Sequence, residues 1–436
     1  MPYFPLIIIF FGVILFSFLF PKLQKNLIFF IIPINVLADI FMQFFSEENE
    51  IHSGFIRASI LMAIILLYIR KFKLNRLSLI ILAFLIYLGI LIFLSSNFTH
   101  SLNSYIKVVL SFSLIPISFY TIKNQNAFKK LQVSLIFSVG LALVNFGLVQ
   151  IFNLGAKKYS EEIFYPGGMG VYITYLFVYA LVISPLGYYL LQKKSSRLLI
   201  IIMSALGIAI VIVTFRRGAI LALMIGFTIL LLMGYWKMRR QIVKMLALGL
   251  IVSFICFLLY GNVISYLFQQ RIVQGISKEL ESTHGRVNET RVVWKELFHK
   301  SFKHTFFGTE LFNSMDYFHD WKRYGRPIHI DYNAILHGSG IIGLTLFLIV
   351  FWMIIKLFYR LQKYFPDTPF YKRLKATFWA TLAVSFILSF STQLWVLTSY
   401  SMFCINIGAM LRMATNAKRV YKEYIIQKRA NKFFSK

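Results

Sequence analysis

Long apolar segments separated by short polar links run along nearly the whole chain. Each is long enough to cross a hydrocarbon core about 30 Å thick as an α-helix. Because a lipid-embedded backbone must satisfy its own hydrogen bonds, the pattern predicts an all-α polytopic membrane protein. We expect thirteen transmembrane helices, or twelve if the first segment does not cross completely. The predicted spans are 5–20, 27–45, 54–69, 78–95, 105–121, 132–153, 169–190, 198–215, 218–235, 245–267, 341–357, 376–392 and 396–411.

One long polar segment, 269–340, interrupts this pattern. It separates 1–268, which holds the first ten spans, from 341–411, which holds the last three. A basic tail, 412–436, follows. The polar segment contains eight of the 16 acidic residues and six of the eight histidines. Any chemistry that needs titratable side chains is therefore expected there.

Composition excludes a soluble protein, and the distribution of charge argues against nucleic-acid binding. The chain is 58% hydrophobic, with a mean hydropathy of +0.71 and a net charge of +30. Its Lys and Arg residues occupy alternate links instead of one soluble face, which is the positive-inside signature of membrane proteins. We expect the basic links and the tail in the cytoplasm, and the polar segment and the amino terminus outside. The basic links are 22–25, 70–76, 123–130, 193–197, 237–244 and 358–375.

Residues 288–301 of the polar segment predict an amphipathic helix. Val292, Trp294, Leu297 and Phe298 have roughly helical spacing, with charged residues between them. We expect these four side chains to form the apolar face of a helix that lies on the membrane surface or on the bundle.

Four arginines are candidates for binding an anion. Arg216 and Arg217 lie between two apolar segments, on a link predicted to face outside, where the positive-inside rule gives no reason for them. Guanidinium groups stay charged and bind phosphate bidentately, so a lipid-linked phosphate is the functional interpretation. Snorkelling to lipid headgroups is the alternative. Arg286 and Arg291 begin the predicted helix, where surface salt bridges with neighbouring glutamates are equally consistent.

His329 and Asp331 stand just before the next apolar helix, which we expect to begin near Ile341. A histidine there can act as a general base on a sugar hydroxyl, because its pKa is near neutral. The alternative is a solvated histidine at the membrane interface. The glycines in 338–340 suit close helix packing better than a phosphate loop. The histidines show no metal-ligand spacing, so the sequence predicts no metal and no cofactor.

Three features of the chain follow one another in the order found in a known family. Together they resemble the O-antigen polymerase and ligase superfamily, the Wzy/WaaL-type membrane glycosyltransferases. The motif-bearing match covers roughly 213–350, and the rest agrees only as a many-spanned bundle. The features are Arg217-Gly218 opening a span, an Arg/Trp helix followed by Phe306-Phe307-Gly308-Thr309-Glu310, and His329-x-Asp331-Tyr332 leading to a helix with Gly340 and Gly343.

The resemblance implies metal-independent, inverting glycosyl transfer from an undecaprenyl-pyrophosphate-linked oligosaccharide. It places the protein in the bacterial inner membrane with its active site facing the periplasm, where membrane lipids surround it. A chain-length regulator is a further partner that the resemblance allows. By motif, the pyrophosphate would be held by Arg217, with Arg216 beside it, and then by Arg291 or Arg286. His329 would lie near the acceptor.

The chain departs from the family pattern at two places. Gly167 follows Pro166 where the family often has asparagine. The frequent His-Asn pair is His329-Ile330 here, which leaves Asp331 as the candidate polar partner of the histidine. This form is more similar to the polymerase branch, so we expect the polymerisation of repeat units into O-antigen or a related surface polysaccharide.

Two alternatives remain at this point. A ligase that transfers the polymer to lipid A core would use the same donor. A flippase or transporter for lipid-linked sugars would also need many spans, and it would place polar groups near the membrane midplane. Asp39, with Arg57 and Lys107 nearer the helix ends, is the candidate for such a group.

Overall fold

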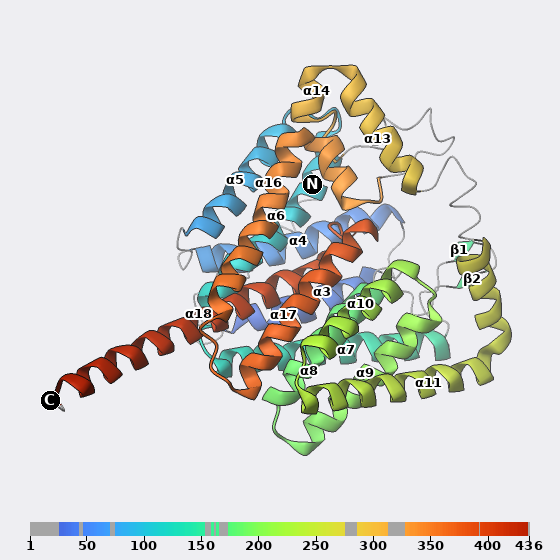
Figure 1. The fold of residues 1–436 in the computed structure, drawn as a ribbon. Helices are drawn as coiled ribbons and strands as arrows, with labels where there is room; N and C mark the ends of the chain where they lie inside the picture. Colours follow the sequence, from blue (N-terminus) through green and yellow to red (C-terminus); the bar gives the residue numbers. More distant parts are fainter. Residues whose placement is uncertain are drawn as a thin grey trace.

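The computed structural model describes residues 26–42, 47–69, 75–152, 158–160, 163–164, 173–274, 286–312, 328–391 and 393–434. These residues form a helical bundle with one short antiparallel hairpin, β1 (Lys158–Ser160) and β2 (Ile163–Phe164) (Figure 1). The helices are η1 (Leu27–Phe30), α3 (Ile31–Met42), α4 (Glu47–Ile69), α5 (Arg76–Ile92), α6 (Phe98–Thr121), α7 (Gln125–Phe152), α8 (Ile173–Leu190), α9 (Lys194–Val213), α10 (Arg217–Met233), α11 (Trp236–Phe268), η3 (Gln269–Val273), α13 (Arg286–Lys300), α14 (Phe302–Phe307), α16 (Asp331–Gln362), α17 (Pro369–Leu388), η4 (Ser389–Ser391) and α18 (Leu397–Phe434).

Helices coincide with every predicted span from 27–45 onward. Seven of them, α6, α7, α8, α9, α11, α16 and α17, are long and apolar enough to cross a membrane. The all-α membrane protein expected from the sequence is thus confirmed. The count of thirteen crossings and their sidedness stay predictions, and span 5–20 and the Pro166–Gly167 segment lie outside the described residues.

The bundle has a buried central helix and apolar outer helices. α11 exposes large side chains such as Phe254 and Leu258, and a lipid environment can accept these. The first half of α18 is enclosed, with Tyr400 and Phe403 buried among aromatic rings. It is also polar, because Asn406 and several hydroxyl-bearing residues lie inside the protein. Such a helix depends on protein contacts more than on lipid.

The basic tail continues the helix that precedes it. α18 continues without interruption from Leu397 to Phe434, so the predicted last span and the region around Lys418 belong to one helix. Figure 1 shows its carboxyl-terminal part projecting away from the bundle. Val420, Tyr421 and Tyr424 are exposed there.

α16 begins earlier than expected and contains a break. Its first residue is Asp331, not Ile341, and Gly340 interrupts it with φ 64° and ψ −167°. Only glycine adopts this backbone region readily. A β-carbon at Gly340 would lie 2.3 Å from the backbone of Phe306, and one at Gly308, where φ is 84°, would lie 2.5 Å from Gly338. Close packing is therefore the role of these glycines.

The segment around Gly308 is also held to α5 and α6 by hydrogen bonds. The Glu310 carboxylate accepts hydrogen bonds from the Ser95 hydroxyl and from the backbone N–H of Ser96, the latter at 2.6 Å. Ser101 donates to the carbonyl of Leu311 at 2.6 Å. α14 and the start of α16 are thereby fixed at one end of the bundle (Figure 1).

We expect Gly340→Ala to destabilise the protein. Alanine would pay a left-handed backbone penalty of about 1–2 kcal/mol and would also press against the backbone of Phe306. Thermal unfolding in detergent measures the effect. Gly147→Ala in α7 is the matched control, since a β-carbon there meets nothing within 4 Å. If both variants melted at the wild-type temperature, the close contact would not matter.

Candidate functional site

α13 packs on the start of α16 through a face that includes half of the predicted one. Leu297 and Val293 are buried and pack with Ile328 and residues of α16, and Val292 packs against them, whereas Trp294 and Phe298 are 49% and 45% exposed. The buried face also includes Glu289, one turn before Val293. Hydrophobicity alone did not indicate this part of the face, because it contains a carboxylate.

Glu289 caps the beginning of α16. Its carboxylate is 2% exposed and accepts the backbone N–H of His329 at 3.0 Å and that of Ile330 at 3.0 Å. The first N–H groups of a helix lack intrahelical partners and carry a partial positive charge, so an anion stabilises them. Glu289 therefore fixes the backbone of His329, and it is not a partner in a surface salt bridge.

Asp331 connects α16 to the segment between α17 and α18. Its side chain is buried and accepts the backbone N–H of Gln393 at 3.3 Å and that of Leu394 at 3.1 Å. The predicted partner of His329 thus holds a chain connection in place. His329 itself is half-buried directly before Ile330, the residue that caps α16.

Arg216 and Arg286 come together from distant parts of the chain. Arg286, the first residue of α13, donates from Nη1 to the hydroxyl of Ser391 at 3.2 Å. The guanidinium carbon of Arg216 lies 6.0 Å from the centre of the Tyr175 ring, and the Tyr175 hydroxyl donates to the Ser391 carbonyl at 2.5 Å. Ser391 thus contacts Arg286 and Tyr175, and Tyr175 contacts Arg216; we name Arg216, Arg286, Tyr175 and Ser391 the arginine cluster.

Arg217 is half-buried at the first position of α10, next to this cluster. The following residue, Gly218, packs so closely on Ser391 that a β-carbon would lie 2.3 Å from the hydroxyl oxygen. The turn before it is strained, because Phe215 has φ 46°. The short link between α9 and α10 is thus a fixed turn that presents two arginines.

Arg291 lies elsewhere. It is exposed, and its position two residues after Glu289 puts it on roughly the opposite side of α13. The sequence left open whether Arg286 or Arg291 would act, and the structure brings Arg286 alone of the two into the arginine cluster. Glu289, Tyr175 and Ser391 were missed as site residues. The polar residues Ser389, Ser391, Thr392 and Gln393, at the end of the predicted span 376–392, were a signal for Ser391.

A second carboxylate joins α13 to α16. Glu296 pairs with Lys300, and its Oε2 lies 3.5 Å from Nε2 of the buried His337. Burial raises the pKa of Glu296, but hydrogen bonds with His337 and Lys300 outweigh it, so the net pKa is lowered. His337 therefore lies in the packed joint between these helices, as expected for a residue of the re-entering helix.

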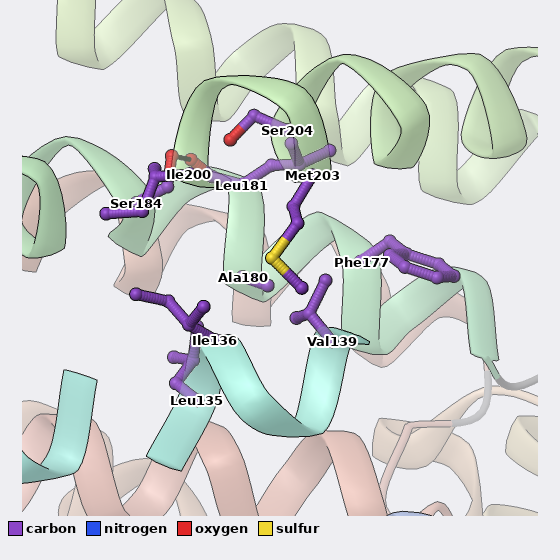
Figure 2. A pocket seen from close by; sticks show the side chains of 10 residues that line it. All are labelled: Leu135, Ile136, Val139, Phe177, Ala180, Leu181, Ser184, Ile200, Met203 and Ser204. Carbon is purple, nitrogen blue, oxygen red and sulfur yellow. Dashed lines mark hydrogen bonds between the residues drawn. The ribbon is translucent and has the colours of Figure 1, made fainter. Parts of the chain in front are cut away.

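An apolar crevice lies apart from the arginine cluster, between α7, α8 and α9 (Figure 2). Ser184 and Ser204 are the polar residues among the ten that line it. Phe177 of α8 lines the crevice, whereas Tyr175, two residues earlier, contacts Ser391. Residues two apart lie on roughly opposite sides of a helix, so α8 separates the two sites.

The lowered pKa of Glu296 predicts acid sensitivity. Its ionisation stabilises the fold above the ordinary glutamate pKa of about 4.3, and this stability is lost as pH falls through the lower folded-state pKa. Thermal unfolding of Glu296→Gln and wild type should differ near neutral pH and converge in acid. Glu423→Gln, which removes an exposed carboxylate paired with Arg419, is the control. A constant difference across the pH range would contradict the prediction.

Comparison of the sequence with protein-family models and with curated proteins gave no match.

Proposed function

We propose that this protein is a membrane glycosyltransferase that polymerises undecaprenyl-pyrophosphate-linked oligosaccharide repeat units at the outer face of the bacterial inner membrane. The observation that carries the proposal is that Arg216 and Arg286 both lie near Tyr175, Arg216 over its ring and Arg286 on Ser391, the residue that Tyr175 also bonds. Sequence separates the two arginines by seventy residues, and both stand at the beginning of a helix or directly before it. The sequence motifs described above supply the class of substrate.

The reaction needs a group that stabilises the departing pyrophosphate. An acceptor hydroxyl oxygen forms a bond to the anomeric carbon of the donor sugar, while the bond from that carbon to the pyrophosphate oxygen breaks. The electron pair of the broken bond stays on undecaprenyl pyrophosphate. Arg216, Arg217 and Arg286 would neutralise the charge as it develops, which is the most effective moment for electrostatic stabilisation. With three cationic side chains, the proposed mechanism requires no metal.

The acceptor hydroxyl must also lose its proton. We assign this role to His329, whose ordinary pKa suits a base near neutral pH. Glu289 holds the backbone of His329, and Asp331 holds the segment that carries Ser391. Glu289 and Asp331 are thus positioning residues in this proposal. They would keep the base and the arginine cluster at a constant separation, as effective catalysis requires.

The proposed activity is tested with purified protein and a lipid-linked repeat unit, without lipid A core. A ladder of lipid-linked polymers that persists in EDTA is the expected product. Product that appears only with lipid A core would identify a ligase instead. Movement of the lipid-linked sugar across vesicles without bond formation would identify a transporter.

Arg286→Lys is expected to lower the polymerisation rate by about tenfold or more, because lysine keeps the charge but loses the planar fork of donors. Arg291→Lys is the matched control on the same helix and should keep wild-type activity, since Arg291 is exposed. Both variants should elute as folded protein in detergent. Equal rates for the two variants would remove Arg286 from the proposed site.

His329→Ala is expected to lower the rate by roughly 10²-fold or more, as the loss of a general base does. Its melting temperature should stay near that of wild type, because the hydrogen bond to Glu289 comes from the backbone N–H of residue 329, which alanine keeps. His337→Ala should show the opposite behaviour, with lowered stability and a retained rate per folded molecule. An active His329→Ala variant would show that the base is elsewhere.

A further inference from the structure

A cluster of charged residues lies within the helices, away from the arginine cluster. Asp39 of α3 forms an ion pair with Arg57 of α4, and its second oxygen accepts a hydrogen bond from the Thr398 hydroxyl of α18. Lys107 of α6 is close enough for its charge to interact with both Arg57 and Asp39. The sequence named these three charged residues together as a candidate group within the membrane, and the structure brings them together.

The charges of this cluster do not balance. Asp39 neutralises Arg57, and both of its oxygens are engaged, which leaves the positive charge of Lys107 in excess. No other carboxylate among the described side chains is available to it, because each has partners elsewhere. Those pairings are Glu289 with His329 and Ile330, Glu296 with Lys300, Glu310 with Ser95 and Ser96, Asp331 with Gln393 and Leu394, Asp367 with Lys372, and Glu423 with Arg419.

The cluster also contains unused hydrogen-bond donors. Among the described residues, Nδ2 of Asn35 and Nε of Arg57 are buried without a hydrogen-bond partner. Asn35 lies one helical turn before Asp39, on the same side of α3, and its backbone carbonyl accepts from the Thr398 hydroxyl at 3.4 Å. Unsatisfied donors and an excess charge are costly at membrane depth. An anion with several acceptor oxygens would accept from these donors and balance the charge of Lys107, which is half-buried.

This cluster and the arginine cluster are joined by one short piece of chain. Ser391 contacts Arg286, and Thr398, seven residues later, contacts Asp39. A fully extended residue spans at most about 3.6 Å, so Ser391 and Thr398 lie no more than about 25 Å apart. Two lipid headgroups bound at the two clusters would therefore be neighbours.

We infer that Lys107 and Arg57 form a second binding site for the phosphate of a lipid. The inference rests on the proposed function. In that function, the occupant of the second site is the pyrophosphate of the second lipid-linked substrate. A transferase that joins two lipid-linked oligosaccharides must hold two such headgroups at once. The Lys107 ammonium supplies a compact charge, and Arg57 and Asn35 supply donors for the phosphate oxygens.

Native mass spectrometry of delipidated protein tests the site, with undecaprenyl pyrophosphate and phosphatidylglycerol as separate probes. The wild type should bind two molecules of undecaprenyl pyrophosphate. Lys107→Met should bind the second about tenfold or more weakly, whereas Lys107→Arg should restore it. Lys356→Met is the matched control, because Lys356 is also a half-buried lysine of a membrane helix. It should bind two.

Two molecules bound with equal strength by Lys107→Met and wild type would overturn the inference. So would a variant that loses phosphatidylglycerol alone, because the occupant would then be a structural lipid. The two proposals fail differently. A single site that depends on Arg286, in a protein that still makes polymer, would overturn only this inference. Two sites in a protein that makes no glycosidic bond would overturn the proposed function.

Discussion

The hydrogen bonds from Gln393 and Leu394 to the Asp331 carboxylate are the interaction on which the arrangement of this bundle depends. Between α17 and α18 the chain leaves helical geometry while still inside the protein, and its N–H groups have no water to bind. Asp331 satisfies two of them. The Gln393 side chain completes the junction by bonding Tyr179, Ser385 and Ser389. With this short segment fixed, Ser391 can bond Arg286 and Tyr175 of the arginine cluster, and Thr398 can bond Asp39.

Most of the described carboxylates of the polar segment accept hydrogen bonds from backbone N–H groups. Glu289, Glu310 and Asp331 all accept backbone N–H groups, and Glu296 alone is engaged mainly by cationic side chains. A strongly basic chain has few acids, and this one uses them where helices begin or break. Each holds non-helical backbone against the bundle.

The sequence predicted the helices well, because apolar length and the position of basic links report directly on membrane crossing. It also predicted the helix at 288–301 and the close packing of the glycines in 338–340. It did not show where hydrogen bonding decides burial. Trp294 and Phe298 of the predicted face of α13 are exposed while Glu289 is buried, and the first turn of α16 depends on Glu289. Asp39, Arg57 and Lys107 were named together, but their pairing requires three helices to meet. No local pattern of hydrophobicity contains that information.

The polar, enclosed first half of α18 has a consequence for biosynthesis. Thr398, Ser401 and Asn406 make this segment a poor candidate for entering lipid alone, and α18 is not among the described helices whose composition suits an independent crossing. It needs a slot already lined by protein. Its neighbours α6, α8, α16 and α17 all precede it in the chain, so they have been synthesised when α18 leaves the ribosome. The order of the chain therefore allows this polar span to be inserted after the helices that enclose it.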